Sequence, residues 1–179
     1  QEVGVVPQNI PGGDIYAALE KGTIDAAEFV GPYDDSKLGF NKVAPFFYYP
    51  GWWEGGVTLM NLINLAKWNE LPSAYKGVVK SASALANSVM MARYDTLNPP
   101  ALKKLVSEGT KLRPYSLEIL EACFNAANKV YAEIGAENAE FKKLHDSYMG
   151  YRGDGYLWFQ LAEYNMDTFM MIQQRGGKL

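Results

Sequence analysis

Residues 19–32 have the sequence LEKGTIDAAEFVGP, and the architecture we expect of the chain follows from this stretch. Residues 15–21, which overlap the start of this stretch, predict a short helix that ends at Gly22 in the left-handed conformation. The apolar run Ile24 to Val30 then predicts a β-strand, closed by Gly31-Pro32. A short helix followed at once by a strand is typical of an α/β arrangement.

The first third of the chain differs from the rest. Further runs of strand length lie there, at residues 3–6, 43–49 and 57–63. From Leu65 onward apolar residues recur at helical spacing, and we expect no strand there. The helices are expected at residues 73–94, at 99–109 with Asn98 as N-cap and Pro99 at the first position, from Ser116 to about Ile134, at 138–148, and at 156–174, the last being a long C-terminal helix. The sequence therefore predicts a mostly helical α/β fold, divided into a strand-containing segment (1–64) and a helical portion (65–179).

Composition excludes several classes of protein. The net charge of −3 comes without any basic stripe, so we expect no nucleic-acid partner. No apolar run approaches the roughly 20 residues that span a bilayer. Cys123 is the only cysteine, which excludes an intramolecular disulfide and a zinc site built from cysteines. We expect Cys123 to be a small core residue.

Three segments together carry a resemblance to a known family. They are residues 6–16 (VPQNIPGGDIY), residues 19–32, and residues 49–54 (YPGWWE). The chain resembles the DctP-type solute-binding receptors of TRAP transporters, in particular the branch that binds 2-oxo acids and similar monocarboxylates. This resemblance implies the C-terminal portion of a two-lobed, type II-like periplasmic binding protein, in which residues 1–64 cross between the lobes and the N-terminal lobe is absent from this chain.

The resemblance also implies a site. Its metal ligands are the Glu28 side chain, the Phe29 carbonyl and the Glu54 side chain, and these oxygen ligands suit a hard cation, sodium or calcium, that bridges the bound carboxylate. The expected substrate-binding residues are Glu28, Phe29, Val30, Trp52 and Trp53. Taken without the motif match, Glu28 and Glu54 are better interpreted as unconnected surface acids, the usual place of glutamate.

One feature of such receptors has no counterpart here. The arginine that clamps the substrate carboxylate precedes the segment that opens this chain, and none of the four arginines present matches it. They are Arg93, Arg113, Arg152 and Arg175. We therefore expect these 179 residues to bind ligand weakly and to expose the aromatic residues between Phe46 and Trp53. Such apolar surface favours self-association, there or as a homodimer through the C-terminal helix.

The function implied is that of a periplasmic receptor that delivers a small organic carboxylate to the permease subunits of a TRAP transporter and catalyses nothing. Two alternatives stay open on the residues alone. One is a metal-dependent α/β enzyme that uses Glu28 or Asp25 as a base on a small carboxylic acid. The other is a helical protein-interaction module. Neither a positioned base with an activated nucleophile nor a cofactor motif favours the enzyme.

Overall fold

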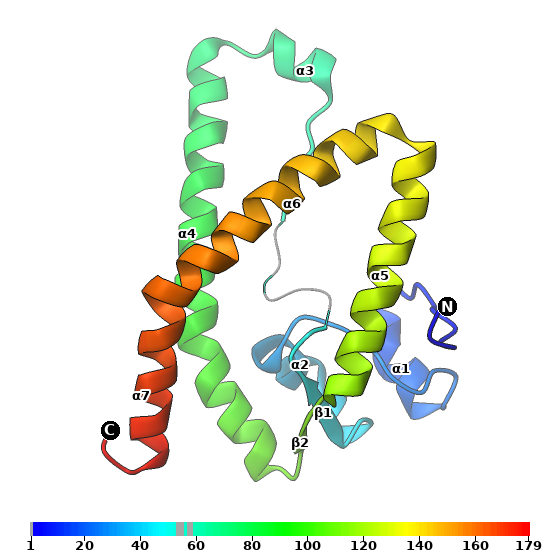
Figure 1. Cartoon of the computed structure of the whole chain (residues 1–179), viewed down its shortest axis with the longest axis vertical. Helices are drawn as coiled ribbons and strands as arrows, with labels where there is room; N and C mark the ends of the chain where they lie inside the picture. Colours follow the sequence, from blue (N-terminus) through cyan, green and yellow to red (C-terminus); the bar gives the residue numbers. More distant parts are fainter. Residues whose placement is uncertain (1, 53–55, 57–58) are drawn as a thin grey trace. The chain divides into compact units, whose positions relative to one another are not determined.

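The computed structural model describes residues 2–52, 56 and 59–179. It forms two compact units, residues 1–124 and 125–179, whose boundary falls within one helix. Along the chain (Figure 1) the elements are η1 (Gly12–Asp14), α1 (Ile15–Glu20), α2 (Pro32–Leu38), η2 (Phe40–Lys42), β1 (Phe46–Tyr49), α3 (Leu65–Glu70), α4 (Ser73–Ser107), β2 (Lys111–Pro114), α5 (Leu117–Glu137), α6 (Ala139–Phe159), the π-helical segment η3 (Gln160–Tyr164) and α7 (Asn165–Arg175). The expected fold class, α/β and mostly helical with a long C-terminal helical region, is confirmed.

The sheet has two parallel strands, with Phe46 of β1 opposite Lys111 of β2. The expectation that all strands precede Leu65 is wrong, because β2 follows α4. The expected strand at residues 24–30 is also absent from the described structure, as are those at 3–6 and 59–63. Residues 57–58 of the last run lie outside the described part. A strand needs a neighbouring ladder of N–H and C=O groups. Of the strands expected from the sequence, only the one that became β1 has such a partner, β2, among the described residues.

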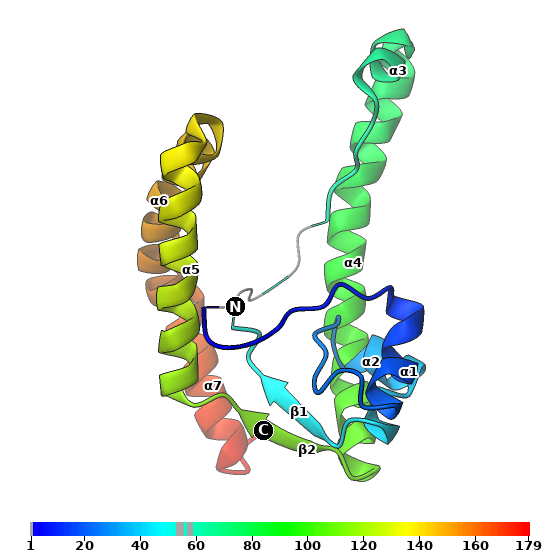
Figure 2. The same ribbon diagram turned by 90° about the vertical axis from the view of Figure 1, so that its right-hand side faces the viewer.

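Helix α4 runs without interruption from Ser73 to Ser107, through Pro99 and Pro100. We expected two helices with Asn98 capping the second, and this is wrong. Each proline lacks an N–H and so removes one rung of the helical ladder. Figures 1 and 2 show α3 folded back over the first turns of α4, and α2 beside its C-terminal half.

Two short elements flank the predicted ligand segment. Helix α1 ends as expected, at Gly22 with φ +67°, and the Thr23 N–H donates to the Ala18 carbonyl (3.0 Å). Helix α2 was not expected. It begins at Pro32, a favoured first position, carries two aspartates in its first turn and ends at Gly39 with φ +72°.

The second unit is built from helices alone. Helix α6 begins where a helix was expected, and Asn138 is its N-cap, because the Asn138 Oδ1 accepts the Phe141 N–H at 2.9 Å. The expected break between residues 148 and 156 is absent, since α6 continues through its three internal glycines to Phe159. Glycine costs about 1 kcal/mol in a helix interior but keeps its N–H donor, so the ladder persists.

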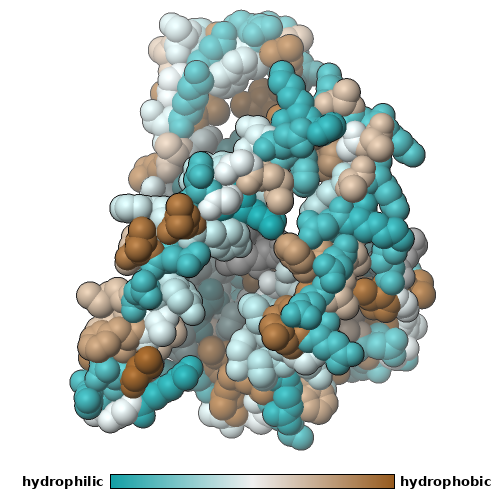
Figure 3. Space-filling model, viewed as in Figure 1, coloured by the Kyte–Doolittle hydropathy of each residue, from teal (hydrophilic) through white to brown (hydrophobic). Residues whose placement is uncertain are grey.

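The buried core is small and lies in the first unit. Its apolar members are Ile15, Phe40, Ala101, Leu105 and Cys123, of which Leu105 is only 1% exposed. Cys123 is thus a core residue, as expected. Many large apolar side chains remain at the surface, visible as brown areas in Figure 3. They include Phe46, Tyr48 and Tyr49 of β1, as expected, whereas Phe47 and Trp52 are half-buried and Trp53 lies outside the described residues. Among the described helices, none combines the length and the apolarity that crossing a membrane requires.

Candidate functional site

The segment that carries Glu28, Phe29 and Val30 links α1 to α2. The Phe29 ring packs edge to face on Phe40, with ring centroids 5.2 Å apart. A Cβ at Gly12 would come within 3.3 Å of the same ring, so glycine at that position leaves the ring its space. Phe29 is half-buried, whereas Glu28 and Val30 on either side are exposed. Anchoring the Phe29 side chain therefore leaves its two neighbours facing outward.

A carboxyl that the sequence reading missed lies beside this segment. The Asp35 Oδ1 accepts the Gly31 N–H at 3.4 Å, while the Asp35 N–H donates to the Gly31 carbonyl at 2.9 Å. Burial raises the pKa of Asp35 from 3.8 to about 6, the bond from Gly31 opposes this rise, and the negative charges of Asp34 and Glu28 add to it. The ligand segment therefore lies in a negative local potential.

Helix α2, which carries Asp35, is joined to α4 by two hydrogen bonds between residues far apart in the sequence. The Tyr33 N–H donates to Asn98 Oδ1 (3.1 Å), and the Tyr94 hydroxyl donates to Asp34 Oδ2 (2.8 Å). That donation raises the pKa of Tyr94 above its usual value of 10.0. The spacing of Pro32 and Gly39 could have revealed α2, but no sequence signal paired it with α4.

The remaining predicted residues are only partly placed. Trp52 is half-buried. Trp53 and Glu54 lie outside the described residues, so the expected convergence of Glu28 and Glu54 stays a prediction. Within residues 2–52, 56 and 59–179, no three His, Cys, Asp or Glu side chains group as a metal site would require.

The residues that are described nevertheless fit a hard cation. Glu28 offers an exposed carboxylate, and its neighbour Phe29 contributes a backbone carbonyl. Calcium and sodium are held by such oxygen ligands. A cation here would also offset the repulsion between Glu28 and the aspartates of α2.

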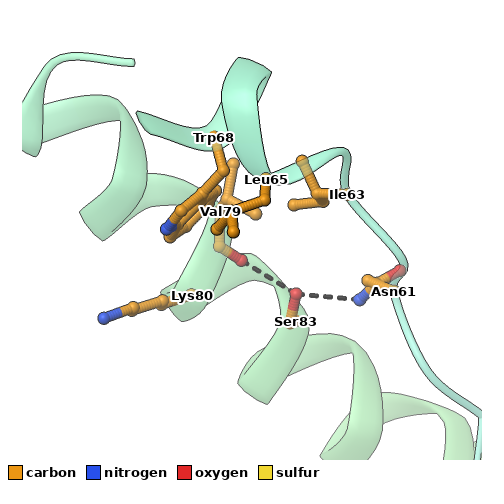
Figure 4. A pocket seen from close by; sticks show the side chains of 7 residues that line it. All are labelled: Asn61, Ile63, Leu65, Trp68, Val79, Lys80 and Ser83. Atoms are coloured by element: carbon orange, nitrogen blue, oxygen red, sulfur yellow. Dashed lines mark hydrogen bonds between the residues drawn. The ribbon is translucent and has the colours of Figure 1, made fainter. Parts of the chain in front are cut away.

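A separate hollow of about 440 Å³ lies where α3 meets the start of α4 (Figure 4). Its lining residues are Asn61, Ile63, Leu65, Trp68, Val79, Lys80 and Ser83. Asn61 Nδ2 donates to Ser83 Oγ at 2.9 Å, which ties the segment before α3 to α4. Of the predicted site residues that the structure describes, Glu28, Phe29, Val30 and Trp52, none lines this hollow.

Comparison with known families identifies the chain. Residues 1–138 match the family described as bacterial extracellular solute-binding protein, family 7. The chain belongs to this family. The recognition made on the three motif segments is thereby confirmed, and the family-7 chain can be compared with its characterised relatives.

Among these relatives is the monocarboxylate 2-oxoacid-binding periplasmic protein of Nostoc sp. (strain PCC 7120), 45% identical over 172 residues. A TRAP transporter solute-binding protein from Bordetella bronchiseptica RB50 has a TM-score of 0.95 at 42% identity; its crystal structure is a mixed-occupancy dimer with copurified calcium and picolinate in one active site and an apo site. A TRAP periplasmic solute-binding protein from Colwellia psychrerythraea, with bound calcium and pyruvate, has a TM-score of 0.86 at 29% identity.

The family-7 chain spans about half the length of these relatives. The matches cover 96% of this chain and 47% of the Nostoc protein, 98% and 52% for the Bordetella protein, and 92% and 51% for the Colwellia protein.

Proposed function

We propose that this chain contributes the Glu28–Val30 side of a binding site for a small 2-oxo acid or similar carboxylate, held together with a calcium ion. The observation that carries the proposal is the 0.95 TM-score, at 42% identity, to a receptor whose structure holds calcium and picolinate. The second relative with bound calcium, the Colwellia protein, holds pyruvate, which belongs to the same class of ligand.

The local chemistry supports this assignment. Glu28 and the Phe29 carbonyl would hold the cation, with Glu54 as a further carboxylate ligand, and the cation would accept the carboxylate of the substrate. Val30, Trp52 and Trp53 would wall the ligand. The protein's own contribution is to hold these groups in place, and no bond of the ligand is made or broken.

The wider role follows from the family. We propose that the protein acts in the periplasm and delivers its ligand to the permease subunits of a TRAP transporter, which membership of the family supports. Pairing of two copies through the C-terminal helices would cover exposed apolar residues of α6 and α7, such as Leu157, Trp158 and Phe169. The division of the chain into residues 1–64, which would cross between the lobes, and the helical residues 65–179 remains part of this proposal.

The test is calorimetric titration with pyruvate, with calcium and after chelation of calcium. It is run on these 179 residues and on the complete product of the gene, because we expect the 179 residues alone to bind weakly. Glu28→Gln should weaken calcium-dependent binding on the order of 10- to 100-fold, since a charged ligand is lost. Glu20→Gln, the same change at an exposed position of α1, serves as the control.

Two results would contradict the proposal. One is pyruvate binding by the complete gene product that is indifferent to calcium and to Glu28→Gln. The other is conversion of pyruvate to a product during the titration, which would favour the enzyme alternative.

A further inference from the structure

The ligand segment lacks the usual support for a binding strand. No described residue pairs with residues 24–30 in a β-ladder. The ring of Phe29 is anchored on Phe40, but one ring contact fixes neither the direction of a neighbouring carboxylate nor that of a carbonyl. Helix α2, which follows the segment directly, is an element that can fix its geometry.

Helix α2 is joined to the segment through its N-cap, Gly31. The N–H and C=O of Gly31 are both engaged by Asp35, at 3.4 and 2.9 Å. Any rotation of α2 therefore moves Gly31, and with it the backbone of Val30 and Phe29. The contacts that hold α2 therefore determine how precisely the backbone of Phe29 and Val30 is placed.

The N-terminus of α2 has an unusual acceptor. The first N–H groups of a helix have no partner inside it, and the N-cap side chain normally supplies one. Here the N-cap is Gly31, which has no side chain, and Pro32 has no N–H. The Tyr33 N–H is satisfied instead by Asn98 Oδ1 from α4, 65 residues further along the chain.

A second contact reinforces the first. Tyr94 lies one turn before Asn98 on α4, so both face the same side. The Tyr94 hydroxyl donates to Asp34 at 2.8 Å, and its ring packs edge to face on Tyr33 with centroids 6.3 Å apart. Both side chains are half-buried, which limits competition from water. Asn98 and Tyr94 thus bind α2 at two successive residues.

We propose that Asn98 and Tyr94 are positioning residues for the carboxylate and cation site, acting by fixing α2, and through it the Glu28–Val30 segment, onto α4. This inference rests on the proposed function for what is bound, and on the hydrogen bonds for how the segment is held.

The experiment compares four variants of the protein. Asn98→Leu removes the acceptor of the Tyr33 N–H, and Tyr94→Phe removes only the hydroxyl. The controls are Asn87→Leu and Tyr75→Phe, the same changes at exposed positions of α4. Circular dichroism and melting temperature confirm that each variant is folded at 25 °C.

Two quantities are measured for each variant. Hydrogen–deuterium exchange of peptides covering residues 28–38, without ligand, reports how firmly the segment is held. Calorimetry with calcium and pyruvate reports binding. We expect Asn98→Leu to speed exchange there about tenfold and to weaken binding by a similar factor, since a buried donor is left unpaired. Tyr94→Phe should have a smaller effect of the same kind, and the controls none.

The outcomes separate the ideas. Exchange at 28–38 that is unchanged in both Asn98→Leu and Tyr94→Phe overturns the inference, as does faster exchange with unaltered affinity. If Asn98→Leu does not fold, Tyr94→Phe, which keeps the ring contact, decides by the same two measurements. Failure of the wild-type protein to bind pyruvate with calcium contradicts the proposed function itself. That failure is recognised separately, because the exchange measurement uses no ligand.

Discussion

The two compact units differ in where their stability comes from. Among the described residues, every buried apolar side chain, from Ile15 to Cys123, lies within residues 1–124. Residues 125–179, all of them described, contain no buried residue. The second unit relies on local interactions: the Asn138 cap, the ion pair between Lys142 and Asp146 (2.6 Å), and the packing of Tyr131, Phe141 and His145. Helices that bury no face of their own are marginal in water.

The largest effect should follow from removing the most buried side chain. Leu105→Ala should lower the free energy of unfolding by about 2–5 kcal/mol, because it leaves a cavity in the core. The matched change Leu157→Ala, at a 66% exposed position of α6, should cost less than about 0.5 kcal/mol. Urea denaturation measures both. A comparable loss for Leu157→Ala would show that this surface of the second unit is covered in solution.

A smaller effect, confined to the first unit, concerns Asp35. Its folded-state pKa of about 6 lies above the ordinary 3.8, so the fold favours the protonated form. The stability it contributes is complete below about pH 4 and is lost as the pH rises through 6. Asp35→Asn should remove that dependence and raise stability at pH 7 by about 1 kcal/mol, allowing for its partial exposure. Urea denaturation from pH 4 to 7, without calcium, tests this; an unchanged slope in the variant argues against it.

The smallest effect belongs to the second unit. Asn138→Ala removes the cap of α6 and should cost about 1 kcal/mol. Asn125→Ala, inside α5, leaves the cap intact and should not destabilise. Peptide-level hydrogen exchange then shows whether the loss stays within residues 125–179. If exchange also rises around Leu105, the two units unfold together. They then form one cooperative unit, although only the first contains buried residues.

Local patterns were sufficient for much of the fold. The end of α1 at Gly22, the start of α5 at Ser116 and the Asn138 cap all follow from residues within four positions of the boundary. The long-range features were missed. Pro99 indicates a helix start, yet α4 continues through it. Asn98 accepts a hydrogen bond from Tyr33 instead of capping a new helix, and the next turns are held by the buried side chains of Ala101 and Leu105. Strand β2 exists only because β1 pairs with it.

In the candidate site too, local patterns identified some residues, whereas long-range contacts were missed. The motif match points to Glu28 and Phe29; Glu28 is exposed and the Phe29 ring packs on Phe40, and their roles in binding stay a prediction. Asp35 could have been found from the boundaries of α2 at Pro32 and Gly39. Asn98 could not, because nothing in a single sequence shows that an amide on one helix completes the end of another.

Asn98 follows Tyr33 by 65 positions, which also separates the two in time. A ribosome adds roughly 5–20 residues per second, so the ligand segment emerges several seconds before the helix that holds it. During that interval the segment has neither a ladder nor the α4 contacts. If Asn98 and Tyr94 position the segment as proposed, its geometry is acquired only after the chain has been extended beyond Asn98.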